Sequence, residues 1–122
     1  MFSPHNPRDF FRLATQLLRD PNYSPLETRV RTVIGRAYYA AFLISKAKQE
    51  TRGHTFPDDH TVHRLVIDSF SYDGLTNIAS KLNDLKDCRS DADYHMSINQ
   101  SNVLGGKCLR LAEDIFRLLE SV

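Results

Sequence analysis

The sequence lacks a long apolar run, a charge imbalance and a cysteine framework, and each absence excludes a class of protein. A transmembrane helix needs about 20 apolar residues in succession, and no stretch of the 122 residues approaches this length. Residues 1–7 do not show the charged-then-apolar plan of a signal peptide. A formal net charge of +1 argues against a dedicated duplex-DNA binder, which is usually strongly basic. We therefore expect a cytoplasmic protein that does not enter a membrane.

The cysteines and the histidines of the central loop do not form a recognisable disulfide or metal pattern. Cys88 and Cys108 lie on separate helical segments without metal-ligand spacing, so they are interpreted as reduced thiols in the core. His54, His60 and His63 suggest a metal site, but they have no cysteine or convincing carboxylate partner. A polar loop with a histidine near the start of a helix is the favoured interpretation. Because a phosphate-binding glycine loop is also missing, we expect neither a metal nor a cofactor.

Apolar residues recur at helical spacing along the chain, whereas strand-like alternation is absent. A first helix is predicted from Asn6-Pro7 to the break at Asp20-Pro21-Asn22. Ser24-Pro25-Leu26-Glu27 has the spacing of a capping box, which predicts a second helix from there to about residue 50 or 51. Apolar residues cover most of the circumference of this helix, so it is predicted to be the hub of a bundle.

Two further polar segments mark the predicted starts of a third and a fourth helix. Asp58 or Asp59 is placed to cap a short third helix, and Asp73 is placed to cap a fourth helix over about residues 74–96. A last helix is predicted from Asn99 to the C-terminus, with Gly105-Gly106 inside it. The chain is thus predicted to be one all-α domain over residues 1–122, an antiparallel bundle of about five helices.

One arginine interrupts the apolar stripe of the predicted fourth helix. At about 100° per residue, Arg89 falls in the middle of the stripe. The other members of the stripe are Leu75, Ile78, Leu82, Leu85, Ala92 and Met96. Burying an uncompensated charge is costly, so Arg89 is expected either to pair with a carboxylate or to line a cleft. His95 lies six residues further on, at the edge of the same stripe.

Spacing alone leaves two interpretations of Arg89 and His95 open. The first is structural, since Arg89 with Asp93 and Asp91 with His95 are i,i+4 pairs that would tie the helix to its neighbours. The second is RNA cleavage, in which the histidine is a general base, the arginine stabilises the phosphate attacked by a 2′-hydroxyl, and Asp91 orients the imidazole. The two side chains lie about 120° apart around the helix, so two copies across a two-fold axis would bring them into one groove.

Three motifs in order resemble the prokaryotic HEPN superfamily. They are Arg36-Ala37-Tyr38-Tyr39-Ala40-Ala41-Phe42 with Ala47-Lys48, His60 at the start of a short helix, and Arg89 followed by Ala92-Asp93-Tyr94. The resemblance covers residues 8 to 120, which is nearly the whole chain. It implies an α-helical bundle that commonly dimerises. In many members it also implies a metal-independent endoribonuclease of toxin–antitoxin, phage-defence or RNA-processing systems.

The resemblance assigns roles to individual residues. Arg89 and His95 match the family's Arg-x4-6-His motif and are the candidate catalytic pair. The candidate supporting residues are Ser90, which fills the polar position after the arginine, Asp91, Asp93 and Tyr94. Arg36 and Tyr39 are candidate contacts to RNA or a nucleotide. Aromatic residues at helical spacing are more often core, and this is the favoured interpretation of the cluster of Tyr38, Tyr39 and Phe42.

The resemblance also implies partners. They are an RNA substrate, a second copy of the chain and, in a toxin pair, an antitoxin of the nucleotidyltransferase type. In members controlled by such an antitoxin the modified tyrosine follows the histidine, whereas Tyr94 precedes His95, so that mode of control is not expected here. Other members are non-catalytic modules that bind a nucleotide or a nucleotidyltransferase-like partner, and this alternative stays open.

Overall fold

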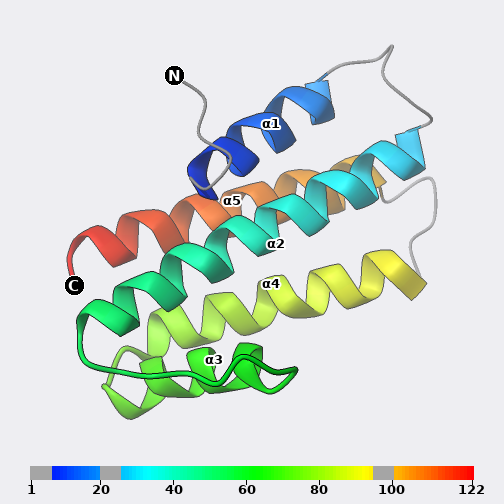
Figure 1. The fold of residues 1–122 in the computed structure, drawn as a ribbon. Helices are drawn as coiled ribbons and strands as arrows, with labels where there is room; N and C mark the ends of the chain where they lie inside the picture. Colours follow the sequence, from blue (N-terminus) through cyan, green and yellow to red (C-terminus); the bar gives the residue numbers. More distant parts are fainter. Residues whose placement is uncertain (1–6, 20–25, 95–100) are drawn as a thin grey trace.

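The computed structural model describes residues 7–19, 26–94 and 101–122, and these ranges form five α-helices and no strand (Figure 1). The helices are α1 (Pro7–Arg19), α2 (Leu26–Thr51), α3 (Val62–Tyr72), α4 (Thr76–Tyr94) and α5 (Ser101–Glu120). The predicted all-α fold is confirmed, and the second helix ends within the predicted range. The predicted helix starts at Asn6 and Asn99 and the predicted end near Met96 lie outside the described residues. Within the described ranges, no helix combines the length and the apolarity that crossing a bilayer requires.

The central helix of the bundle is α2. It packs against α1, α3, α4 and α5, and Figure 1 shows it between α1 and α4. Its buried residues include Val30, Val33, Ile34, Ala37, Tyr38, Ala40, Ala41 and Phe42. Several of these are alanines, which let neighbouring helices approach closely. The predicted role of this helix as the hub is therefore confirmed.

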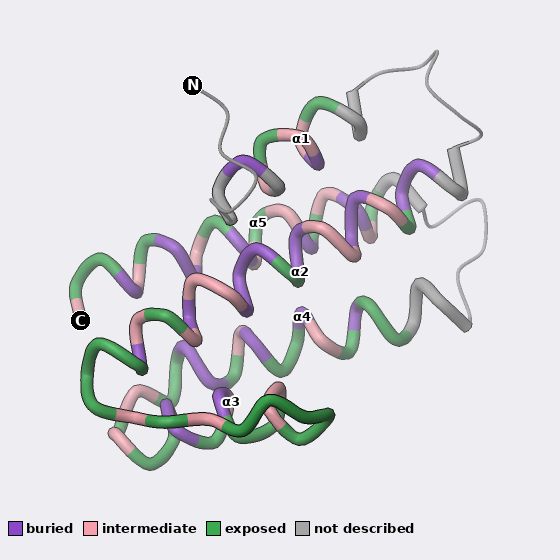
Figure 2. The backbone as a smooth tube through the Cα atoms, viewed as in Figure 1, coloured by how far each residue is buried: buried purple, intermediate pink, exposed green. Residues whose placement is uncertain are grey.

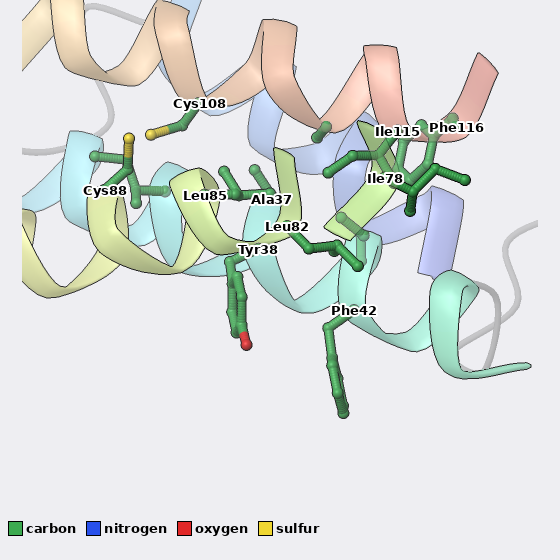
Figure 3. Close-up of a cluster of buried hydrophobic side chains, with 14 of the residues drawn as sticks. Ala37, Tyr38, Phe42, Ile78, Leu82, Leu85, Cys88, Cys108, Ile115 and Phe116 are labelled. Atoms are coloured by element: carbon green, nitrogen blue, oxygen red, sulfur yellow. The ribbon is translucent and has the colours of Figure 1, made fainter. Parts of the chain in front are cut away.

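Four helices, α2, α3, α4 and α5, contribute buried side chains to the main core. The buried side chains of α4 and α5 meet those of α2, and Figure 2 shows the buried positions of these helices facing the interior. Cys88 of α4 and Cys108 of α5 are buried free thiols, and Figure 3 shows their sulfur atoms pointing toward one another. Burial raises the pKa of the Cys108 thiol, and the neighbouring Cys88 adds to this effect. The predicted core position of both thiols is confirmed.

Two glycines end α2 and α3 in the same way. Gly53 and Gly74 adopt positive φ angles of 100° and 78°, a region that glycine enters without steric cost. After α2, the amide of Gly53 donates to the Glu50 carbonyl and the amide of His54 donates to the Gln49 carbonyl. This is the bonding pattern of a Schellman motif, and Gly74 and the following residue repeat it after α3. The chain can therefore reverse sharply at both points.

The carboxylate of Asp73 joins the end of α2 to the turn between α3 and α4. Its Oδ2 accepts hydrogen bonds from Gln49 Nε2 at 2.9 Å and His54 Nε2 at 2.8 Å, and Arg52 Nη2 lies 3.6 Å away. Gln49 is fully buried and also donates to Ser69 Oγ at 3.0 Å. The hydrogen bonds from Gln49 and His54 are the main reasons why the pKa of Asp73 is lowered. The prediction that Asp73 caps the fourth helix is wrong, because these donors hold its side chain against α2 instead.

Asp58 or Asp59 was predicted to cap α3, and Asp59 is the one whose side chain bonds to the residue before this helix. Its Oδ1 accepts the backbone N–H of Thr61 at 2.8 Å and also the Thr61 hydroxyl. These bonds lower the pKa of Asp59. The helix itself begins at Val62, and its N-cap residue, Thr61, makes no side-chain capping bond. Asp59 therefore closes the turn that precedes α3 and does not cap the first helical turn.

We expect Asp73→Asn to destabilise the fold at neutral pH. The asparagine side chain is uncharged, whereas Arg52 and the two hydrogen-bond donors surround the negative charge of the Asp73 carboxylate. The pKa of Asp73 is lowered from 3.8, so its contribution is present above that pH and is lost as the pH falls through the folded-state pKa. Urea denaturation at several pH values measures the effect. The unfolding free energies of wild type and variant should differ at neutral pH and converge below pH 3.8.

Asp68→Asn is the matched control for this substitution. Asp68 lies 3.7 Å from Arg64 on an exposed face of α3, where ion pairs contribute little to stability. This variant should unfold like the wild type. Equal effects of the two substitutions at neutral pH would contradict the role assigned to Asp73.

Candidate functional site

An open hollow lies between α2 and α4. It is lined by Thr32, Gly35, Arg36 and Tyr39 from α2 and by Arg89 from α4, and its volume is about 340 Å³. The four α2 residues occupy positions i, i+3, i+4 and i+7, so they share one face of the helix. The hollow therefore brings three of the predicted site residues, Arg36, Tyr39 and Arg89, to one place on the surface.

Arg89 is exposed and rests against an aromatic ring. Its guanidinium carbon lies 5.3 Å from the centre of the Tyr38 ring, which is a cation–π contact. Of the two arrangements expected for Arg89, lining a cleft is observed. Its expected place in the middle of the apolar stripe is wrong, because Cys88 occupies the buried position that follows Leu85 and thereby leaves Arg89 at the surface.

Tyr38 supports Arg89 from the interior. Its side chain is 1% exposed, and Figure 3 shows it pointing away from α5 on the same side of α2 as Phe42. Its hydroxyl forms a hydrogen bond of 2.7 Å with Nδ1 of His63 on α3. Burial raises the pKa of Tyr38 to about 12, although Arg89 opposes part of this effect. The phenol is therefore protonated at neutral pH.

His63 is held as a neutral imidazole. Burial is the main cause that lowers its pKa, followed by the positive charges of Arg89 and Lys86. Its ring stacks on Phe42, with the ring centres 4.0 Å apart and 25° between the planes. In the tautomer whose Nδ1 accepts from the Tyr38 hydroxyl, the neutral ring carries its hydrogen on Nε2.

His63 is the site residue that sequence reasoning missed. The sequence groups it with His54 and His60, but the structure separates the three: His54 binds a carboxylate at the end of α3, and His60 is exposed before that helix. Among the described residues, no group of three or more His, Cys, Asp or Glu side chains is arranged to hold a metal ion. The four-residue spacing of Tyr38 and Phe42 indicates an aromatic face on α2, but it does not indicate which residue of another helix covers that face.

The aromatic cluster of α2 divides between core and surface. The predicted core position is confirmed for Tyr38 and Phe42, which are 1% and 5% exposed. It is wrong for Tyr39, which is 46% exposed at the hollow. Arg36, beside it, is half-buried, and its Nε is buried without a hydrogen-bond partner in the described part of the chain. The hollow thus combines an accessible aromatic ring with two guanidinium groups.

The remaining predicted site residues lie at or beyond the end of α4. Ser90 is exposed. The backbone of Asp91, Asp93 and Tyr94 belongs to the last turn of α4, but their side chains lie outside the described residues, as does the whole of His95. The two i,i+4 ion pairs that the sequence suggests therefore stay predictions.

The fold and the hollow together define an all-helical domain that presents cationic and aromatic side chains on its hub helix. Comparison with known protein families agrees, since residues 8–122 match the HEPN domain. The chain therefore belongs to the HEPN family, as its motifs around Tyr38 and Arg89 predict. No curated protein and no solved structure gives a significant match.

Gly35 lines the hollow although the fold of a single chain has room for a larger residue there. A Cβ atom on Gly35 would meet no heavy atom within 4 Å. Glycine inside a helix costs about 0.5–1 kcal/mol relative to alanine, so we expect Gly35→Ala to raise the free energy of unfolding by that amount. Urea denaturation measures the change. Gly74→Ala should destabilise instead, because Gly74 has a φ of 78°. A loss of stability in Gly35→Ala would show that the space is not open.

Proposed function

We propose that this protein is a metal-independent endoribonuclease of the HEPN type and acts as a toxin or phage-defence effector. The proposal rests above all on the position of Arg89, which is exposed at the hollow while its guanidinium lies over Tyr38. A guanidinium that uses its face on an aromatic ring keeps its in-plane N–H groups for a phosphate. Arg89 is therefore suited to hold a phosphodiester group at the surface of the protein.

In the proposed reaction, RNA supplies its own nucleophile. His95 accepts the proton of a 2′-hydroxyl, whose oxygen forms a bond to the adjacent phosphorus. The bond from phosphorus to the 5′-oxygen breaks, and that oxygen takes a proton from the protonated imidazole. Arg89 stabilises the negative charge that develops on the phosphate oxygens, and Asp91 orients His95. The products are a 2′,3′-cyclic phosphate and a 5′-hydroxyl end.

Arg36 and Tyr39 are the proposed binding residues. The exposed ring of Tyr39 offers a face on which a base can stack, an interaction that tolerates any sequence. Arg36 adds a second guanidinium for the backbone. Its buried Nε lacks a partner in the described part of the chain, and a buried donor left unpaired costs about 1–3 kcal/mol. A phosphate that draws this guanidinium into new hydrogen bonds would recover part of that cost.

Two copies of the chain form the cleavage groove in this proposal. His95 lies six positions after Arg89, which places the two about 120° apart around a helix, so one chain alone presents them poorly to the same phosphate. A two-fold axis beside the hollow would bring Arg89 of one chain toward His95 of the other. The open hollow between α2 and α4 leaves room for a second copy beside Arg89.

The alternative function is a non-catalytic module that binds a nucleotide or a nucleotidyltransferase-like partner. The size of the hollow favours the nucleotide, because about 340 Å³ lies within the range of small-molecule sites. In this case Tyr39 would stack on the base and Arg36 and Arg89 would hold the phosphates. The alternative predicts nucleotide binding without RNA cleavage.

We expect Arg89→Ala and His95→Ala each to lower the rate of RNA cleavage by about 10²–10⁴-fold, because each removes a group that acts in the transition state. The measurement is cleavage of a pool of labelled single-stranded RNAs in the presence of EDTA. Arg64→Ala and His60→Ala are matched controls at exposed positions and should cleave like the wild type. Cleavage that survives both active-site substitutions would contradict the mechanism, and so would wild-type cleavage that stops in EDTA.

Mixing the two inactive variants tests whether the groove is shared. If Arg89 of one chain acts with His95 of the other, a dimer of one Arg89→Ala chain and one His95→Ala chain keeps one intact pair. We therefore expect the unfolded and refolded mixture to cleave RNA well above the level of either variant alone. A mixture as inactive as its components would show that each chain uses its own pair.

A further inference from the structure

Positive charge gathers on the side of Arg89 that faces α3. Lys86 and Arg89 are three residues apart on α4, so they lie on the same face of the helix, one turn apart. Arg89 lies 5.3 Å from the centre of the Tyr38 ring, and the hydroxyl of that ring is hydrogen-bonded to His63 on α3. The charges of Arg89 and Lys86 both lower the pKa of His63, in agreement with this arrangement. The hollow between α2 and α4 includes neither Lys86 nor His63. These two residues therefore belong to a separate part of the surface that shares only Arg89 with the hollow.

We propose that Lys86, Arg89 and His63 form a subsite for a phosphate ester, beside the hollow that Arg89 lines with Arg36 and Tyr39. The ligand is a phosphate group of an RNA chain or of a free nucleotide. The inference rests on the proposed function, in which Arg89 holds a phosphate, and adds a second phosphate position on the α3 side. It assigns a binding role to two residues outside the Arg-x4-6-His motif.

The contacts of His63 leave one edge of its ring for a ligand. The Tyr38 hydroxyl occupies Nδ1 at 2.7 Å, and the stack on Phe42, with ring centres 4.0 Å apart, restricts rotation of the ring. In the tautomer whose Nδ1 accepts from Tyr38, the hydrogen on Nε2 is presented in a fixed direction, away from Tyr38. A neutral imidazole can donate this hydrogen to a phosphate oxygen without losing the proton.

Arg89 is placed to serve both phosphate positions. Its guanidinium carbon lies over the Tyr38 ring, and the five N–H groups point outward in the guanidinium plane. Donors on one edge can reach a phosphate in the hollow while donors on another edge reach a phosphate near Lys86. Arg89 would then mark the boundary between two consecutive phosphates of a bound strand.

The charges around His63 favour an anion. The titratable groups that face it from neighbouring helices are Tyr38 of α2 and Lys86 and Arg89 of α4. Tyr38 is neutral, and Arg64, which follows His63 in sequence, pairs with a carboxylate one turn further along α3. Two cations thus act on the imidazole and disfavour its protonation. A bound phosphate reverses this effect, so it should raise the pKa of His63.

A pH titration of the full chain, followed through the imidazole NMR signals, tests the subsite. His63→Gln identifies the signal by its loss. The probes are a 2′-O-methyl oligoribonucleotide, which lacks the nucleophile and is not cleaved, a nucleoside monophosphate, and inorganic phosphate. We expect the RNA or the nucleotide to raise the pKa of His63. The probe that raises it identifies the source of the phosphate. If neither ester raises the pKa of His63, the subsite is overturned. If inorganic phosphate alone raises it, the site holds an adventitious ion only, and the subsite is overturned as well.

A matched pair of lysine variants provides a second readout. Lys86→Gln should weaken binding of the active ester several-fold and, with RNA, reduce the slope of log affinity against log salt by about one. Lys46→Gln is the control, because this ammonium pairs with Glu50 at 3.1 Å on α2, and it should bind like the wild type. Thermal unfolding checks that both variants are folded. Wild-type affinity in Lys86→Gln overturns the subsite. These assays measure the binding of ligands that cannot be cleaved, so their result does not depend on cleavage activity. A wild type that fails to cleave RNA contradicts the proposed function but does not decide whether the subsite exists.

Discussion

The buried hydroxyl of Tyr38 is the constraint on which the rest of the structure depends. Tyr38 lies in the middle of the hub helix, and a buried donor without a partner costs about 1–3 kcal/mol. His63 meets this requirement with a hydrogen bond of 2.7 Å, so α3 must dock with one particular face toward α2. The other function of the same ring is to support Arg89. A single side chain therefore couples the packing of three helices to the position of the cation.

Features that are local in sequence predicted much of this fold. The apolar circumference of residues 26–51 predicted a central helix, because a helix that is apolar on several sides must be covered on several sides. The cost of burying a charge predicted that Arg89 would either line a cleft or pair with a carboxylate, and it lines the hollow, although its predicted place in the middle of the stripe is wrong. The family motifs placed Arg36 and Tyr39 among the candidate contacts, and the structure brings both to the hollow with Arg89.

Contacts between helices account for what the sequence did not predict. Asp73 has the spacing of a helix cap, but three donors near the end of α2 hold its carboxylate. Tyr38 and Tyr39 are adjacent and chemically identical, and only the arrangement of the neighbouring helices decides that one is buried and the other exposed. His63 belongs to the site through Tyr38, which is 25 residues away in sequence. Periodicity identifies the face of a helix that is covered, but it does not identify the residue that covers it.

The burial of Cys88 against α5 determines how α4 is rotated about its own axis. Successive residues of a helix differ by about 100°, so the angle at which the thiol enters the core also sets the angle at which the next side chain, Arg89, leaves the surface. Rotating α4 by one residue would place the Arg89 guanidinium in the buried position of the Cys88 thiol. Burying that charge without a partner would be costly. Volume changes at Cys108, whose sulfur faces that of Cys88, would therefore shift the guanidinium of Arg89 relative to the Tyr38 ring. The interior packing of α4 and α5 thus acts on the position of a surface cation with which it has no contact.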